Sequence, residues 1–219
     1  MSDGARTTWQ NARLVLPCTL VQSAVYALLN HYPLFPPRQL PLTVFDEAIP
    51  FWTWTVWPYL LLLALAPLLP LLIRGDLVFR RLFLAYLLAI PTTFAFFVFL
   101  PTEYQRPAVP SDGSLTSVAY RWLIEVDTEG CCFPSGHVVV PVLFGCGVWL
   151  DGRRGGALLC VLVGLLTPSI LTTKQHYAWD LLGALAIVAG SLFVAYQVIR
   201  PPTPAALPVD LSYTPRNLE

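Results

Sequence analysis

Residues 82–102 read LFLAYLLAIPTTFAFFVFLPT, a stretch of 21 residues without a single Asp, Glu, Lys or Arg. A helix needs about 20 apolar residues to cross a hydrocarbon core of roughly 30 Å, so this stretch predicts a transmembrane helix. The whole chain has the same character, because only 12% of its 219 residues are charged, against about 25% in a soluble domain. This composition excludes a soluble globular protein. It also excludes a nucleic-acid-binding protein, which needs clustered Lys and Arg to neutralise phosphates.

Five further stretches are also free of charged residues, and each of the six has 19 residues or more. They lack the alternating pattern of barrel strands, so we expect an all-α integral membrane protein, a bundle of six transmembrane helices. The expected helices cover 14–30, 52–73, 82–100, 137–150, 155–172 and 179–199. Residues 1–13 are then an N-terminal segment, 14–200 a single membrane domain and 201–219 a flexible, proline-rich tail. The first stretch has no small-residue cleavage site after it, which favours a retained helix over a signal peptide.

Basic residues indicate the orientation of the bundle. Six crossings put both termini on one side of the membrane, and that side carries nine Arg residues, against four basic residues on the other. The positive-inside rule therefore places both termini in the cytoplasm. The short loops favour the inner membrane of a bacterium, with the longer segments facing the periplasm or exterior. The four outward basic residues are Arg38, Arg106, Arg121 and Lys174.

One outward segment, residues 115–126, predicts a short amphipathic helix. Leu115, Val118, Ala119, Trp122 and Val126 recur at helical spacing and form an apolar stripe. Such a helix either lies on the membrane surface or packs against the end of the bundle, and the sequence leaves both open.

Two of the three histidines lie at the outer ends of expected helices, where ionisable groups in a membrane protein usually serve function. His137 opens the fourth helix, and His176 precedes Asp180 by four residues at the start of the sixth. On a helix that spacing places both side chains on one face. A carboxylate on one ring nitrogen makes the other nitrogen a better base or nucleophile.

Groups suited to an anion are expected at the same outer face. Ser135 is a natural N-cap for the fourth helix, and Gly136 permits close approach to its backbone. The free N–H groups of such a helix start attract phosphate. Arg106 and Lys174 add positive charge. Together with the histidines these residues predict phosphoryl transfer through a phosphohistidine.

Two other interpretations of these residues remain open. The polar side chains could satisfy one another where helices pack. Alternatively, His137, His176 and Asp180 could bind a metal ion.

The motifs resemble those of the type 2 phosphatidic acid phosphatase superfamily, whose signature is K-x6-R-P, then P-S-G-H, then S-R-x5-H-x3-D. The corresponding residues here are Arg106-Pro107, the string Pro134–His137, and His176-x3-Asp180 with Ser169 at the serine position. The resemblance covers roughly residues 45–200. It implies that His176 attacks phosphorus, that Asp180 orients it, and that His137 protonates the leaving alcohol. It further implies that Arg106, Ser135 and the Gly136 amide hold the phosphate oxygens, and that neither a metal nor a cofactor is needed.

Two positions depart from the signature, because Phe99 stands at the lysine position and Ile170 at the arginine position. Lys174 could replace one missing cation. A weaker cationic site favours a less charged phosphoester. The third motif and the segment 45–51 also resemble the sphingomyelin and inositol phosphorylceramide synthases of the same superfamily, which transfer a phospho-headgroup to a lipid alcohol.

The sequence therefore predicts an enzyme that hydrolyses a lipid phosphoester taken sideways from the bilayer. A lipid phosphotransferase is the first alternative, and a non-catalytic transporter or scaffold is the second. The oligomeric state and the particular lipid are left open.

Overall fold

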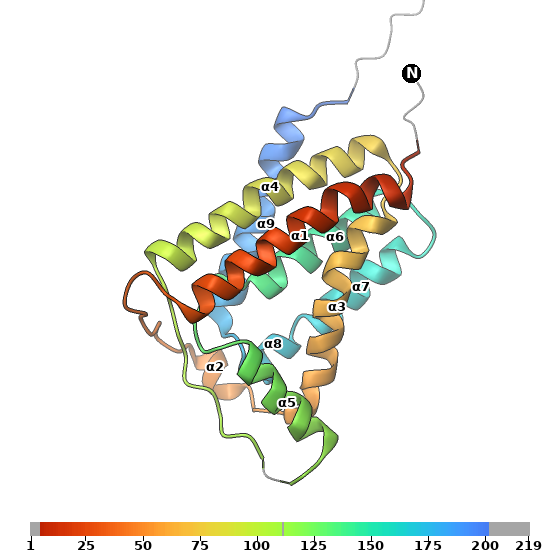
Figure 1. Cartoon of the computed structure of the whole chain (residues 1–219). Helices are drawn as coiled ribbons and strands as arrows, with labels where there is room; N and C mark the ends of the chain where they lie inside the picture. The colour runs from red at the N-terminus through yellow and green to blue at the C-terminus, as the bar shows by residue number, and fades with distance from the viewer. Residues whose placement is uncertain (1–4, 111, 202–219) are drawn as a thin grey trace, which may run out of the picture.

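The computed structural model describes residues 5–110 and 112–201, which form helices and connecting loops without a β-strand (Figure 1). The expected tail 201–219 lies almost wholly outside the described residues. The helices are α1 (Thr8–His31), α2 (Val44–Ala48), the 3-10 turn η1 (Thr53–Thr55), α3 (Val56–Leu72), α4 (Asp76–Phe99), α5 (Leu115–Val126), α6 (Gly136–Leu150), α7 (Gly156–Leu166), α8 (Ser169–Thr172) and α9 (Ala178–Val198).

Each of the six expected apolar stretches is helical, but two helices begin six residues earlier than expected. Helix α1 begins at Thr8 because Thr7 caps it, exchanging bonds of 3.2 Å and 2.8 Å with the backbone and side chain of Gln10. Helix α4 begins at Asp76, an acidic residue that interacts favourably with the N-terminal end of the helix dipole. The residues missed at both starts include charged ones, so a search for charge-free stretches leaves these turns out.

Four segments are long and apolar enough to cross a membrane: Thr8–His31, Thr53–Leu72, Asp76–Phe99 and Ala178–Val198. The chain is thus an all-α protein of the membrane type. Helix α6 has 15 residues, and α7 has 11 because the chain turns at Thr167 and Pro168 before α8. The expectation of one helix over 155–172 is therefore wrong at this turn. Proline breaks the helix there because it has no N–H to donate.

Helix α6 is the centre of the bundle and packs against α3, α4, α7 and α9. Glycine allows the close approach to α4, since a Cβ added at Gly147 would lie 2.3 Å from Leu82 Cδ1. Small residues at such contacts are typical of helices that pack in membranes. The first residues of α6 are thus held rigidly among its neighbours.

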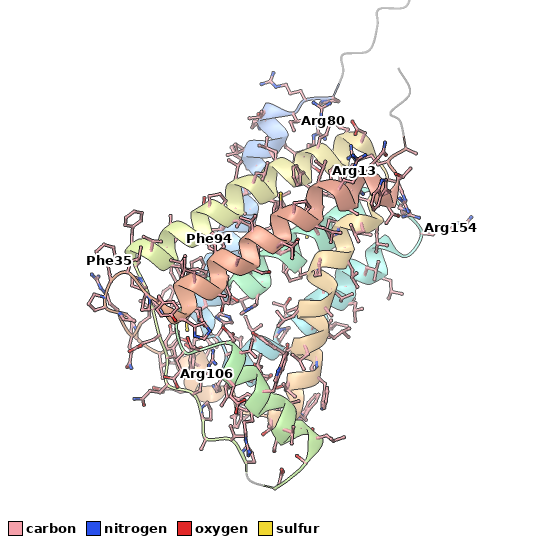
Figure 2. All side chains as sticks on the ribbon, viewed as in Figure 1. Arg13, Phe35, Arg80, Phe94, Arg106 and Arg154 are labelled. Atoms are coloured by element: carbon pink, nitrogen blue, oxygen red, sulfur yellow. The ribbon has the colours of Figure 1, made fainter. Side chains whose placement is uncertain are left out.

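The two ends of the bundle differ in charge, as the sequence predicts. Arg13, Arg80 and Arg154 lie toward the end where the chain begins, and Arg106 lies toward the opposite end (Figure 2). Polar contacts fasten the first end: Arg6 Nη1 lies 2.7 Å from Asp76 Oδ1, and the Asp151 carboxylate accepts bonds of 2.8 Å and 2.7 Å from the amides of Arg74 and Gly75. Both chain ends reach this region, because Arg81 Nε donates to Ile199 O at 2.8 Å.

The helix expected at 115–126 is present as α5 with those same bounds. Tyr120 and Leu123 are buried against the bundle, whereas the apolar stripe faces outward, with Leu115 79% and Trp122 54% exposed. Helix α5 therefore packs against the bundle on one side and carries an outward apolar stripe on the other. An outward apolar stripe is the arrangement that a helix at a membrane surface requires.

Candidate active site

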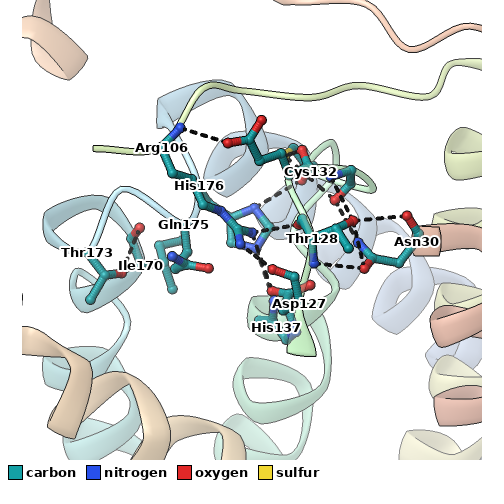
Figure 3. A network of polar contacts seen from close by, with 12 residues as sticks. Asn30, Arg106, Asp127, Thr128, Cys132, His137, Ile170, Thr173, Gln175 and His176 are labelled. Atoms are coloured by element: carbon teal, nitrogen blue, oxygen red, sulfur yellow. Dashed lines mark hydrogen bonds and ion pairs between the residues drawn. The ribbon is translucent and has the colours of Figure 1, made fainter. Parts of the chain in front are cut away.

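His137 and His176 come together at the end of the bundle opposite the chain termini. His137 is the second residue of α6, while His176 lies in the turn between α8 and α9. Helix α9 begins at Ala178, one residue before the predicted bound, with Tyr177 as its N-cap, so His176 precedes the helix and does not open it as expected. The His176 amide donates to Ile170 O at 3.1 Å, which fixes the turn (Figure 3).

The His176 ring has a defined protonation pattern. Its Nδ1 lies 3.1 Å from the backbone oxygen of Cys132 and 3.4 Å from Asp180 Oδ2. A carbonyl oxygen can only accept, so Nδ1 carries the proton and the neutral ring keeps its lone pair on Nε2. Nε2 is therefore the nucleophilic atom of this histidine.

Asp180 is fully buried and has two roles. Its Oδ2 accepts the Tyr177 amide at 2.9 Å, which caps α9, and faces His176 Nδ1. Its Oδ1 has no hydrogen-bond partner among the described residues. The carboxylate thus holds the start of α9 and the imidazole in one geometry.

His137 faces the lone pair of His176 directly. Its Nδ1 lies 3.0 Å from His176 Nε2 and 3.1 Å from the hydroxyl of Tyr59, a fully buried residue of α3. When both rings are neutral, His137 Nδ1 must be the donor, since His176 Nε2 is an acceptor. The Tyr26 and Tyr59 rings flank His137 edge-on, with centroids at 5.5 Å and 5.8 Å. An N–H donor and an imidazole lone pair therefore face each other.

The start of α6 is open for a ligand. Ser135 is its N-cap and is fully buried, but its hydroxyl makes no cap bond and has no partner in the described part of the chain. A Cβ added at Gly136 would find its nearest neighbours, Phe97 and Thr93, only at 3.9 Å and 4.0 Å. Free donors at a helix start are suited to anionic oxygens.

Arg106 lies beside this site but is already paired. Its guanidinium donates to the backbone oxygens of Asp127 and Thr128, the latter at 2.7 Å, and Nη2 lies 3.6 Å from Asp127 Oδ2. The other oxygen of Asp127 accepts the hydroxyl of Tyr26. Asn30 at the end of α1 holds the same loop, since its Oδ1 accepts the Thr128 amide at 2.9 Å (Figure 3). Asp127 therefore offsets the charge of Arg106.

Lys174 is directed elsewhere. Its Nζ donates to the backbone oxygen of Asp46 at 2.7 Å and lies 5.5 Å from the centre of the Tyr177 ring. Partial burial lowers the pKa of Lys174, an effect that the negative charge of Asp46 opposes. The Asp46 carboxylate in turn accepts the Ala178 amide at 2.8 Å. Segment 44–48 thus supports the start of α9, and the role of Lys174 in phosphate binding stays a prediction.

The two residues that depart from the family signature have ordinary surroundings for apolar side chains. Phe99 is 69% exposed at the end of α4, and Ile170 is fully buried in the core. Neither of these apolar side chains supplies a positive charge to the site. Ser169, at the serine position, donates to Leu166 O at 2.6 Å.

A cavity of about 580 Å³ extends from His137 into the bundle. Asp127, Gly136 and His137 line it near the site, and residues of α1, α3, α4, α5 and α6 line the rest. Ligand sites in proteins are usually cavities of this size with a few polar groups at one end. The site and an apolar space are therefore continuous.

Three groups of the site carry no clear signal in the sequence: the Cys132 carbonyl, Tyr59 and Asp127. A backbone oxygen has no sequence signature at all. Tyr59 is recognisable only as a polar group in an apolar stretch, and Asp127 only as one acid among several between 103 and 129.

No protein-family model matches the chain, and no curated protein matches its sequence. In residues 5–110 and 112–201, no three His, Cys, Asp or Glu side chains form a cluster that could hold a metal ion. The fold and the site together define a helical protein of the membrane type with a His–His–Asp arrangement, in which His176 and Asp180 are buried, beside an apolar cavity.

Proposed function

We propose that this protein is a membrane-embedded lipid phosphate phosphatase, a phosphoric ester hydrolase that works through a phosphohistidine. One observation carries the proposal: the Cys132 carbonyl fixes the proton of His176 on Nδ1, and the lone pair on Nε2 faces His137 Nδ1 at 3.0 Å. If these residues only satisfied one another, the buried Ser135 hydroxyl and Asp180 Oδ1 should have partners, and neither has one among the described residues.

The proposed reaction has two steps. The phosphoryl group separates the two rings, His176 Nε2 bonds to phosphorus, and the P–O bond breaks as His137, protonated on both ring nitrogens in this state, gives its Nδ1 proton to the leaving alcohol and becomes neutral. In-line displacement requires nucleophile and leaving oxygen on opposite sides of phosphorus, as the facing nitrogens allow. His137 then takes a proton from water, whose oxygen bonds to phosphorus as the P–N bond breaks. Phosphate leaves and both rings return to their starting state.

The phosphate oxygens are proposed to bind the Ser135 hydroxyl, the Gly136 amide and Arg106. Ser135 supports this, because its buried hydroxyl is without a partner among the residues that the structure describes. Lys174 would contribute only if its side chain left the Asp46 carbonyl. Neither a metal nor a cofactor takes part in the proposed reaction.

The proposed setting is the inner membrane of a bacterium, with six crossings, both termini in the cytoplasm and the site on the periplasmic or exterior side. The charge difference between the two ends supports this orientation. The short α6 would cross inside the bundle, covered by α3, α4, α7 and α9, and α7 would cross at the bundle's surface, where its exposed side chains are apolar. The substrate is a lipid phosphate from the bilayer, and nucleic acid is no partner.

Replacing Asp127 with asparagine is expected to tighten the binding of inorganic phosphate, a product of the proposed reaction, on the order of tenfold. The substitution keeps a similar shape but removes the negative charge 3.6 Å from Arg106 Nη2. A single charge at such a distance is worth about 1 kcal/mol or more, and 1.4 kcal/mol is a factor of ten. The measurement is the inhibition constant for phosphate with purified protein in detergent.

Glu129→Gln is the matched control for this experiment. Its carboxylate contacts only the backbone amide of Arg106, at 3.4 Å, so phosphate inhibition should not change. Unchanged or weaker inhibition in the Asp127 variant would contradict the idea that Asp127 offsets the charge of Arg106.

A lipid phosphotransferase is the second candidate, and the pairing of Arg106 with Asp127 favours it. A site with one partly neutralised cation suits a phosphodiester with one negative charge better than a monoester with nearly two. In this reaction a lipid alcohol takes the place of water in the second step. A transporter or scaffold would turn over neither substrate.

The product of turnover separates these functions. Purified protein is incubated with a labelled phosphatidic acid or a labelled phosphodiester lipid, with and without an added lipid alcohol. We expect free phosphate as the main product. A new phospholipid formed only with the alcohol would establish the transferase instead, and no turnover in any mixture would leave only the non-catalytic alternative.

A further inference from the structure

A polar stripe follows α1 inside the segment that is long enough to span a membrane. Thr19, Gln22, Ser23 and Tyr26 recur at the spacing of one helix face, and all four line the cavity that begins at His137. Polar side chains within a membrane span are costly and usually serve function. The facing wall from α3 is apolar, formed by Leu60, Leu63, Ala66 and Pro67. One wall of the cavity therefore offers hydrogen bonds and the other does not.

Gln22 is held with its donor groups available. The Tyr86 hydroxyl donates to Gln22 Oε1 at 2.7 Å, so the amide oxygen already has a partner. The two N–H bonds of the same amide then remain for another acceptor. An ester or amide carbonyl of a lipid is such an acceptor.

A second, independent observation comes from α4 on another side of the cavity. Thr93 is only 1% exposed and lines the cavity, yet its hydroxyl has no hydrogen-bond partner in the described residues. A buried hydroxyl without a partner costs about 1–3 kcal/mol in general, so such groups usually meet a ligand or water. Its neighbour Thr92 differs, because its hydroxyl donates to Leu88 O at 2.8 Å.

The polar groups lie at graded depths below the histidines. Tyr26 contacts Asp127 at the outer end of the cavity, and Thr19 is seven residues deeper in α1, which corresponds to about 10 Å along a helix. In a glycerolipid or sphingolipid the ester, amide and hydroxyl groups follow directly after the phosphate. In a polyprenyl phosphate only hydrocarbon follows it.

We infer that this cavity selects a lipid phosphate with hydrogen-bonding ester, amide or hydroxyl groups just below its phosphate, a glycerolipid or sphingolipid in preference to a polyprenyl lipid. The inference rests on the proposed function, because that function places the lipid phosphate at the histidines. It adds the substrate class, with Gln22 and Thr93 as the residues that determine specificity.

The first test compares kcat/KM for phosphatidic acid and for a polyprenyl phosphate in mixed detergent micelles. The unmodified protein should prefer phosphatidic acid at least tenfold. Gln22→Leu and Thr93→Val should each reduce that preference roughly 3- to 10-fold, mainly through KM, which corresponds to one hydrogen bond. Two control variants make the same replacements at positions that do not line the cavity: Gln197→Leu on the exposed part of α9 and Thr92→Val beside Thr93. Equal use of both lipids, or equal effects of test and control variants, would overturn the inference.

A binding experiment separates this inference from the proposed function. His176→Ala protein is mixed with equimolar phosphatidic acid and polyprenyl phosphate, and bound lipid is quantified by native mass spectrometry, with and without Gln22→Leu. Preferential binding of phosphatidic acid that Gln22→Leu abolishes supports the cavity assignment even if no lipid is hydrolysed. Absence of a preference overturns it even if the protein proves to be a phosphatase.

Discussion

Replacing His176 with alanine is expected to abolish lipid phosphate hydrolysis, with a loss on the order of 10⁴-fold or more. The variant loses the one atom, Nε2, whose lone pair faces the proton donor His137. Among the described residues, the other side chain within hydrogen-bond distance of His137 Nδ1 is Tyr59. It presents a hydroxyl and not an imidazole nitrogen. The measurement is phosphate release from labelled phosphatidic acid, together with an alkaline quench that preserves the phosphohistidine, which is then identified by the loss of its label in acid.

His31→Ala is the matched control, since His31 is the third histidine of the chain and is exposed at the outer end of α1. It should leave hydrolysis unchanged, and labelled protein should appear with it but not with His176→Ala. Turnover at the normal rate after loss of His176 would exclude the phosphohistidine mechanism.

Much of the fold follows from where charges are missing. The stretch 82–102 predicts most of α4, and five further stretches predict the other long helices. The starts of α1 and α4 are not predictable this way, because capping and charge–dipole interactions extend helices into charged sequence. The break between α7 and α8 depends on local backbone geometry at Pro168, whose effect varies with its neighbours.

The central residues of the site are also visible in the sequence, but their geometry is not. The spacing of His176 and Asp180 predicts contact, and contact occurs, although His176 lies in a turn and not on the helix face that the spacing implies. The Cys132 carbonyl decides which nitrogen of His176 is protonated. That bond joins residues 44 positions apart, and a backbone atom leaves no trace in the pattern of side chains.

The cations illustrate the same limit. In the sequence, Arg106 and Lys174 are simply two of the four outward basic residues. In the structure each has a partner, Asp127 for Arg106 and the Asp46 carbonyl for Lys174. Pairing depends on the tertiary fold, so a count of basic residues overestimates the charge available to a phosphate.

Replacing His137 with alanine is expected to slow hydrolysis of phosphatidic acid about 10²- to 10⁴-fold, the usual contribution of a general acid. An alkoxide is a poor leaving group, and without the proton on His137 Nδ1 the P–O bond must break to form one. The loss should shrink to less than about tenfold for an aryl ester such as p-nitrophenyl phosphate, whose leaving oxygen needs no proton. The measurement is the ratio of kcat/KM between the original protein and the variant for both substrates.

The two substrates distinguish a proton donor from a structural support. His137 is also packed between the rings of Tyr26 and Tyr59, so its removal could disturb the site without any loss of acid catalysis. A disturbed site would slow both esters equally, because both need the same nucleophile and the same phosphate contacts. An equal loss on the alkyl and aryl esters would therefore contradict the assignment of His137 as the acid. A loss confined to the alkyl ester would place the proton on the nitrogen that faces His176, since the leaving oxygen must lie opposite the attacking atom.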